Sequence, residues 1–265
     1  MCCLFLAASS TVAIAQTNVV DLVNPIIGTN GMGHTFPGAC VPFGLVQLSP
    51  DTDTIPHNVD GKYQPRSYEY CAGYQHKDSS IVGFSHTHFS GTGHSDLGDI
   101  LIMPTTGTLK LNPGTATNPD GGYRSPFSHD TEISRPGYYE VMLADYGVKA
   151  QLTTTQRAGI HKYTYPTNSE NQRIILDMIH GIYNYDGKVL WTNIRVENDT
   201  LVTGYRITNG WARTNYTYFA MSFSKPITHY GCEEKAKVNY RGGYAKFNMK
   251  ENFPDIGGRK IVAYF

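Results

Sequence analysis

Residues 148–152 read VKAQL, and this short run decides the fold class. Apolar and polar side chains alternate along it, as expected for a strand that buries only one face. Residues 160–165, IHKYTY, show a similar pattern and are followed by a proline. Turn-forming pairs such as Tyr146-Gly147 and Asn209-Gly210 stand between runs of this kind. The chain is therefore predicted to consist of closely spaced strands.

Further strands are predicted on both sides of this region. Residues 173–178, RIILDM, have the continuous apolar character of a strand buried on both faces. Residues 201–207 and 216–223 are rich in β-branched and aromatic side chains. No run of three helical turns carries capping residues at its ends. Short strands with Gly, Pro and Asn between them predict an all-β fold, an antiparallel β-sandwich.

Composition excludes several classes of protein. The chain has 265 residues, 40% of them hydrophobic and 17% charged, which is enough apolar material for a sizeable core. Basic and acidic residues balance at 22 each, so the net charge is +0. A nucleic-acid-binding surface would require an excess of positive charge. No nucleic-acid partner is expected.

The first residues are typical of an export signal. Residues 4–15 are apolar and small, and they end in Ala13-Ile14-Ala15, which fits a signal-peptidase site before Gln16. The run is too short to span a membrane as a helix. The two cysteines near the start precede the apolar run, which disfavours a lipoprotein anchor. We expect a signal peptide at 1–15, one sandwich domain at 16–265, and a periplasmic, extracellular or cell-surface location.

Signal cleavage would leave three cysteines: Cys40, Cys71 and Cys232. An odd number is not the pattern of a disulfide scaffold. A bridge between Cys40 and Cys71 stays possible, because spacing alone neither requires nor excludes it. None of the three belongs to a Cys-x-x-Cys pair, so a thiolate zinc site is not expected.

Residues 83–99, GFSHTHFSGTGHSDLGD, hold the strongest signal for function. Three histidines, two aspartates and four glycines fall within seventeen positions, and the apolar run ILIM follows at 100–103. Polar loops with glycine that lead into a strand commonly carry binding sites. The alternative is a turn-rich loop whose histidines bond backbone carbonyls.

The histidines of this segment allow two interpretations. In a strand, the His-x-His spacing of His86 and His88 would place both rings on one face, and His94 lies close in sequence. Together with nearby aspartates they could form a zinc site. Hydrogen bonds to a loop backbone or a sugar hydroxyl account for them more simply. No metal site is predicted here.

A second glycine-rich loop, GTNGMGHTFPGA at 28–39, precedes a strand-like run. Together the two segments resemble the amino-terminal domain of glycoside hydrolase family 92, the calcium-dependent exo-α-mannosidases. Ordered blocks at compatible spacing carry the resemblance, which extends from about Val23 onward and is densest up to Pro104. The blocks are VNPIIGT at 23–29, GHTFPGA at 33–39, PFG at 42–44, GFSHTH at 83–88, SGTG at 90–93 and DLGD at 96–99.

The resemblance implies an architecture and an activity. The fold would be a twisted antiparallel sandwich, truncated here before a helical toroid domain, since residues 260–265, KIVAYF, look like an unfinished strand. The activity would be inverting hydrolysis of α-mannoside glycans, including N-glycan degradation. In the family the two carboxylates for that chemistry lie in the helical domain, so the catalytic residues are unassigned here. Calcium is implied, with its ligands outside this chain.

The resemblance also implies candidate substrate-binding residues. The loop with His34 would present polar groups to the non-reducing mannose, and Tyr70 could pack on a sugar face. His94 stands where relatives vary, which suggests a role in choosing the linkage. The spacing of Asp96 and Asp99 would permit a catalytic pair, but the capping of loop turns by aspartate is the favoured explanation. The predicted set is Gly33, His34, Thr35, Phe36, Tyr70, His86, His88, His94 and Asp96.

Two other functions stay open. The chain could be a stand-alone carbohydrate-binding module without catalysis, or a purely structural domain that packs on a partner. Trp191 and Trp211 are expected in the core or at an interface, because large aromatic side chains are usually buried.

Overall fold

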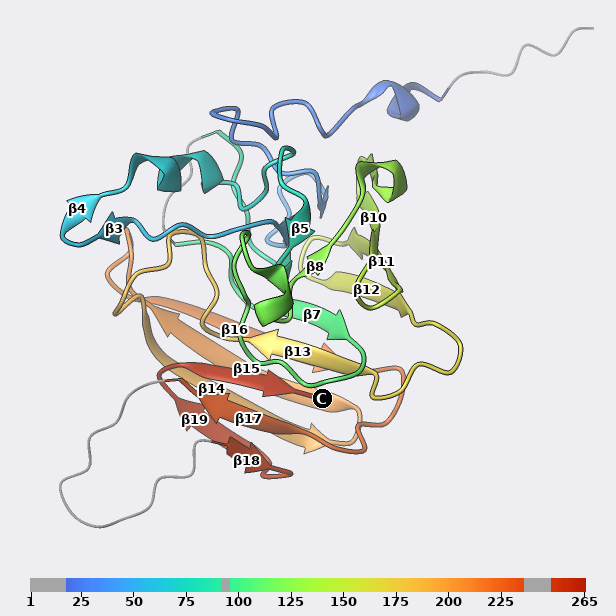
Figure 1. Ribbon diagram of the computed structural model, residues 1–265, viewed down its shortest axis with the longest axis vertical. Coiled ribbons are helices and arrows are strands. Elements are labelled where there is room, and N and C mark those ends of the chain that lie inside the picture. The colour runs from blue at the N-terminus through green and yellow to red at the C-terminus, as the bar shows by residue number, and fades with distance from the viewer. Residues whose placement is uncertain (1–17, 92–95, 236–248) are drawn as a thin grey trace, which may run out of the picture.

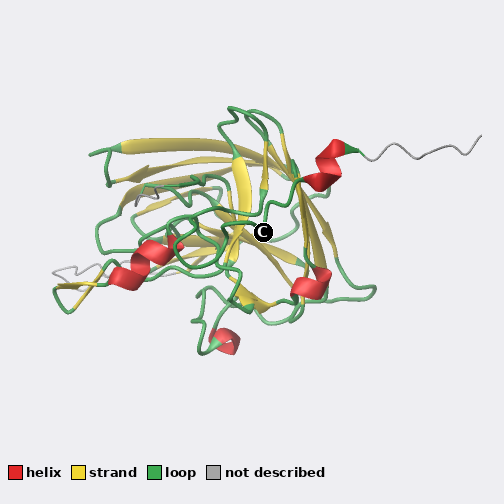
Figure 2. Ribbon diagram, turned by 90° about the horizontal axis from the view of Figure 1, so that it is seen from above, coloured by secondary structure: helices red, strands yellow, loops and turns green. Residues whose placement is uncertain are grey.

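The structure is a computed structural model that describes residues 18–91, 96–235 and 249–265. Strands dominate it, and every strand pairing within these residues is antiparallel (Figure 1). The helical segments in the same residues are short 3-10 helices of one or two turns outside the strand layers (Figure 2). They are η1 (Val19–Leu22), η2 (Pro65–Tyr70), η3 (Pro119–Gly121) and η4 (His129–Thr131).

Three sheets form the body of the molecule. The largest has the order β1-β2-β6-β7-β13-β20-β17-β18, and two four-stranded sheets have the orders β12-β11-β10-β9 and β16-β15-β14-β19. The strands of the large sheet are β1 (Ala39–Cys40), β2 (Gln47–Asp51), β6 (Gly83–Ser85), β7 (Leu101–Thr105), β13 (Arg173–Asp177), β17 (Gly231–Glu234), β18 (Met249–Glu251) and β20 (Ile261–Tyr264).

The two smaller sheets are built from long hairpins. The first contains β9 (Ile133–Arg135), β10 (Tyr138–Leu143), β11 (Val148–Thr154) and β12 (Gly159–Thr164). The second contains β14 (Val189–Asn198), β15 (Leu201–Thr208), β16 (Asn215–Ser222) and β19 (Asp255–Gly258). Two minor ribbons pair β3 (Asn58–Val59) with β4 (Lys62–Tyr63) and β5 (Ser80–Ile81) with β8 (Ser125–Pro126).

Each face of the large sheet is covered by one of the smaller sheets. Met103 of β7 and Ile175 of β13 pack in one apolar cluster with Val141 of β10 and Val148 of β11. The neighbouring side chains in the same strands, such as Ile102, belong to a second cluster on the other face. Ile194 of β14, Val202 of β15 and Ile256 of β19 complete that second cluster. The sandwich therefore has three layers with two apolar cores.

This layering explains the sequence patterns. β7 and β20 are buried at every position, and a strand between two cores needs apolar side chains on both faces. β10 and β11 alternate buried and partly exposed residues, because they cover only one face of the large sheet. The antiparallel sandwich expected from the sequence is confirmed, and the expected strands at 148–152, 160–165, 173–178, 201–207 and 216–223 match β11, β12, β13, β15 and β16.

Two expectations about side chains need comment. Trp191 is 42% exposed and Trp211 is 78% exposed, so a core position for either is wrong and only the interface alternative remains. Cys40 and Cys71 are not joined by a disulfide, so the possible bridge between them does not form. Across the described ranges, no helix is long and apolar enough to cross a membrane.

Candidate functional site

The two glycine-rich loops lie against each other at one end of the sandwich. The backbone N–H of Gly91 donates to the carbonyl of His34 over 2.8 Å, and the ring of His34 bonds the carbonyl of Gly91 over 3.0 Å. His34 adopts a φ of 51°, a left-handed conformation that a non-glycine residue adopts at a cost. The structure thus brings together two segments that are 57 residues apart.

The His34 ring has one nitrogen with a partner and one without. A carbonyl can only accept, so Nδ1 carries the proton and donates to Gly91. Nε2 is buried and has no hydrogen-bond partner within the described structure, and the residue is only 7% exposed. The ring packs edge-on against Tyr68 at 4.6 Å between centroids. A neutral His34 thus offers a lone pair at Nε2 to a ligand hydroxyl, and leaving it unmet costs about 1–3 kcal/mol.

The rest of the first loop is tied to itself. Gly33 is required, since a Cβ there would lie 2.2 Å from the carbonyl oxygen of Gly28. The hydroxyl of Thr35 donates to Ile27 over 2.8 Å, which holds the loop closed. Phe36 places its ring 5.3 Å from that of His88. These contacts fix the position of His34, and none of them settles whether Gly33, Thr35 or Phe36 binds a substrate.

A buried carboxylate lies beneath the loops. Asp51, at the end of β2, is 0% exposed and accepts from Nε2 of His88 and from Nε2 of His180, both over 2.7 Å. Burial alone would raise the pKa of Asp51, but the charges and hydrogen bonds of His88 and His180 outweigh it and hold the pKa well below its usual range. Nδ1 of His88 also faces an acceptor, the carbonyl of Gln47 at 2.8 Å. Both ring nitrogens of His88 therefore face oxygen acceptors, and the ring links the backbone of β2 to the carboxylate of Asp51.

His86 has quite different partners. Because β6 ends at Ser85, the two histidines follow the strand and do not share one strand face as the His-x-His spacing would have placed them. Nδ1 of His86 donates to Ile100 over 2.7 Å, and its Nε2 meets Nε2 of His161 at 3.0 Å. The hydroxyl of Tyr163 completes the chain at Nδ1 of His161 over 2.7 Å. With both rings neutral, the Tyr163 hydroxyl donates to Nδ1 of His161, and Nε2 of His161 donates to Nε2 of His86, so every nitrogen of the two rings has a partner.

Asp96 and Asp99 do not face a common ligand. The carboxylate of Asp96 accepts the backbone N–H groups of Trp211 and Ala212 at 2.6 and 3.0 Å, which ties the second loop to the turn after β15. Asp99 is buried, forms an ion pair with Arg206 at 2.5 Å and accepts from the Thr87 hydroxyl. Asp96 therefore caps backbone N–H groups, as the turn-capping alternative expected. Binding of a substrate by Asp96 stays a prediction.

Tyr70 and His94 complete the predicted set. The hydroxyl of Tyr70 donates to Asp78 over 3.1 Å, and burial together with the charge of Asp78 raises the pKa of Tyr70. Only 4% of Tyr70 is exposed, so its ring is covered by protein. His94 lies outside the described residues.

Three polar residues that the sequence patterns did not indicate organise this end of the sandwich: His180, Lys188 and Arg206. Lys188 is 1% exposed and donates to the carbonyl of Ile182; burial and the positive charge of Arg206 lower the pKa of Lys188 to about 7. A signal for Arg206 exists, because β15 buries alternate residues and places this arginine in its buried row. His180 and Lys188 carry no such signal, since both lie in the irregular segment between β13 and β14.

The described carboxylates at this end already have protein partners. Calcium prefers six to eight oxygen ligands. Here Asp51 is held by two histidines, Asp99 by Arg206, and Asp96 by two backbone amides. The calcium that the family resemblance implies would need oxygen ligands from elsewhere.

Comparison with known proteins identifies the family. The model of the glycosyl hydrolase family 92 N-terminal domain matches residues 22–265. The chain belongs to glycosyl hydrolase family 92. An α-mannosidase of this family from Bacteroides thetaiotaomicron, solved with mannoimidazole, is 40% identical with a TM-score of 0.78. That match covers 93% of this chain and 30% of the enzyme.

Two further family 92 relatives extend the comparison. An inverting mannosidase of the family from B. thetaiotaomicron VPI-5482 is 26% identical, with a TM-score of 0.68 over 95% of this chain and 30% of that enzyme. A curated relative, an uncharacterised secreted glycosidase of Arthroderma benhamiae, is 29% identical over 61% of this chain and 19% of its own length. The chain therefore spans less than a third of the length of these relatives.

Proposed function

We propose that this chain is the amino-terminal sandwich of an exo-acting, inverting α-mannosidase, and that its paired loops form one wall of the mannose pocket. The observation that carries the proposal is the buried, unpartnered Nε2 of His34, held in place by the hydrogen bonds between His34 and Gly91. A sugar presents many hydroxyl donors, and a single fixed acceptor selects their orientation. The 40% identity to an α-mannosidase solved with mannoimidazole supports the same assignment.

Catalysis itself is assigned to another part of the complete enzyme. Inversion needs an acid and a base separated by about 6.5–9.5 Å, with room for a water molecule between the sugar and the base. Asp51, Asp96 and Asp99 already accept hydrogen bonds from protein groups. We therefore place the carboxylate pair, and any calcium ligands, in the carboxyl-terminal helical domain of the complete enzyme. In that arrangement this chain binds and orients the mannose.

The test compares the 265-residue chain with the complete enzyme on α-linked mannobioses, with calcium supplied. We expect turnover from the complete enzyme and none from the chain alone. Turnover by the chain alone that persists through repeated purification would place the carboxylate pair within it and refute this division of labour. A complete enzyme that cleaves no α-mannoside would refute the proposed activity.

The second candidate function, a carbohydrate-binding module, is favoured by one surface feature. Tyr216 and Tyr218 of β16 are 54% and 70% exposed, and their rings lie nearly parallel, with 9° between the ring planes. Flat exposed rings of this kind can stack on sugar faces. Binding of the chain to immobilised α-mannan that is lost in Tyr218→Ala and kept in His34→Ala would favour the module.

A further inference from the structure

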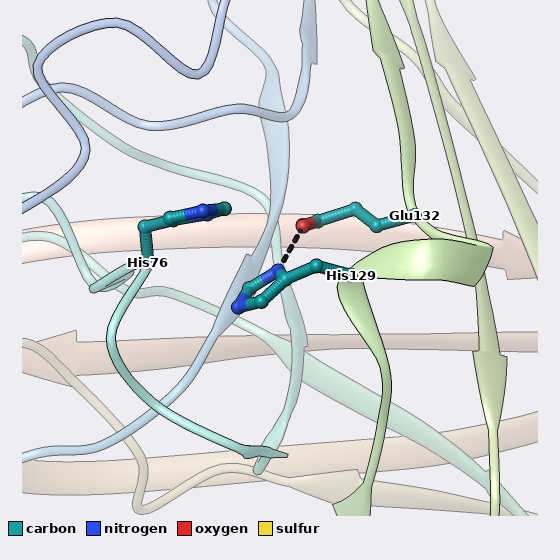
Figure 3. A group of neighbouring side chains, drawn as sticks. All are labelled: His76, His129 and Glu132. Carbon is teal, nitrogen blue, oxygen red and sulfur yellow. Dashed lines mark hydrogen bonds and ion pairs between the residues drawn. The ribbon is translucent and has the colours of Figure 1, made fainter.

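A group of three metal-ligand side chains lies outside the loops described above. His76 comes from the segment between η2 and β5, His129 opens η4, and Glu132 follows η4 (Figure 3). The possible ligand atoms of the three side chains all lie within 4.8 Å of one another. Within the described ranges this is the one such group of three or more.

The spacing fits a four-coordinate ion after a small adjustment. Bonds of about 2.1 Å in a tetrahedral site separate neighbouring ligand atoms by about 3.4 Å. Nδ1 of His129 is already 2.7 Å from Oε2 of Glu132, and the rings of His76 and His129 have their centroids 3.9 Å apart. Rotation of exposed side chains covers the remaining distance, since the side chain of His129 is 38% exposed.

The carboxylate of Glu132 is held as metal ligands usually are. Its side chain is only 3% exposed, and it accepts from the hydroxyls of Tyr139 at 2.6 Å and Tyr74 at 2.8 Å. Both of these hydroxyls donate to Oε1 of Glu132. The other oxygen, Oε2, faces Nδ1 of His129 and also lies 3.0 Å from the Tyr74 hydroxyl. Hydrogen bonds from a second layer of residues fix the direction of a ligand and strengthen metal binding.

The carboxylate of Glu132 has one side chain paired with it by charge. Among the described residues no lysine or arginine forms an ion pair with Glu132, which pairs with His129 alone. The ring of His76 lies over that of His129, with 33° between the ring planes, so both imidazoles lie close to the carboxylate. A divalent ion here would be bound by one nearly buried carboxylate and two imidazole rings together.

We propose that His76, His129 and Glu132 bind a zinc-type divalent cation that ties η4 to the segment before β5. Two imidazole nitrogens and one carboxylate oxygen suit zinc, whereas calcium prefers oxygen ligands alone. The ion would restrain the first glycine-rich loop through two contacts. The backbone N–H of His76 donates to the carbonyl of Thr29 over 2.8 Å, and the side chain of Gln75 bonds both the N–H and the carbonyl of Gly31. The site is thus structural, and it stiffens the loop that carries His34.

The test uses the 265-residue chain after removal of metals with a chelator. Calorimetric titration with zinc chloride should show one bound ion with submicromolar affinity, and excess calcium should leave that affinity unchanged. Cobalt(II) should give the intense visible bands of a tetrahedral site. His76→Ala and His129→Ala should each weaken zinc binding about 100-fold or more, and Tyr139→Phe about 10-fold.

The matched control is His229→Ala, which removes an exposed histidine far from the group in sequence. It should bind zinc as the natural chain does. Circular dichroism of each metal-free variant checks that it is folded, and Tyr139→Phe provides a conservative change if an alanine variant unfolds. Absence of a one-to-one zinc complex, or equal zinc affinity in the control and both histidine variants, would overturn the proposal. Both readouts measure metal binding and not mannoside hydrolysis, so failure of this proposal is distinguishable from failure of the proposed function.

Discussion

His34 is the residue on which the proposed pocket depends. In the complete enzyme, His34→Ala should lower kcat/KM toward α-mannosides at least about tenfold, or roughly 1.4 kcal/mol of transition-state stabilisation. The reason is that Nε2 is buried and otherwise unpartnered, so the substrate hydroxyl would lose its fixed acceptor. Steady-state kinetics measure the effect.

A purely structural role for His34 predicts a different result. Loss of the bond to Gly91 would then lower the melting temperature while the folded enzyme keeps normal kinetics. Measuring both quantities on the same preparation separates the two roles. Unchanged kcat/KM in a destabilised variant would remove His34 from the set of substrate-binding residues.

The His86–His161 pair predicts how stability depends on pH. Burial lowers the pKa of His86 to about 4, and it lowers that of His161 well below its usual value. The unfolded chain therefore binds more protons than the folded chain between about pH 6.5 and pH 4. Because a depressed histidine pKa opposes folding in acid, stability is full above pH 6.5 and falls as the pH drops toward 4, by about 2–3 kcal/mol for His86.

Urea unfolding at pH 7, 5.5 and 4.5 measures this dependence. His86→Gln keeps a polar side chain that cannot be protonated, so its unfolding free energy should fall less steeply over the same range. The depressed pKa of Asp51 stabilises the folded chain above about pH 4, the ordinary range for a carboxyl group, and this stabilisation is lost only as the pH falls below that value. Equal slopes for the natural chain and His86→Gln would show that the pair does not govern acid stability.

At the scale of elements, a buried ion pair joins β15 to the second glycine loop. Arg206 pairs with Asp99, and it also donates to the carbonyls of His180 and Met178. Arg206→Met should lower the free energy of unfolding by about 3–5 kcal/mol, because it leaves the buried carboxylate of Asp99 without its cation. Chemical denaturation provides the measurement.

The double variant Arg206→Met with Asp99→Asn is the matched control for this pair. Removing both charges should restore part of the lost stability, since no unpaired charge is then left in the interior. A double variant as unstable as the sum of the two single variants would mean that the two side chains act independently.

Patterns along the strands predicted most of the large elements. The sequences of β11 and β15 predict strands through alternating apolar and polar side chains or through β-branched residues, because each strand packs on a core with one face and points outward with the other. The two-residue strands, such as β1 and β5, were not predicted. They pair over two residues only, and so short a segment carries no periodicity.

At the scale of the whole molecule, the proposed export signal makes a prediction about the mature chain. The protein recovered from the periplasm or medium of a native or bacterial host should begin at Gln16, because Ala13-Ile14-Ala15 fits the peptidase. Intact mass spectrometry decides this. The similarity to a secreted glycosidase agrees with export. A cytoplasmic pool that retains Met1 as its major form would contradict the prediction.

The sequence by itself determined the fold class, the two glycine-rich loops and the family, because side-chain periodicity and ordered short motifs are local properties of the chain. Only the tertiary structure decided which polar groups meet. The sandwich places His180 and His88 on opposite sides of one carboxylate, Arg206 beside Asp99, and His76 beside His129 and Glu132. Except for the local His129–Glu132 pair, each of these contacts joins residues that are 37 to 129 positions distant in the sequence. The spacing of residues in the sequence does not predict such contacts, because they follow from how the three sheets stack and where their connecting loops converge.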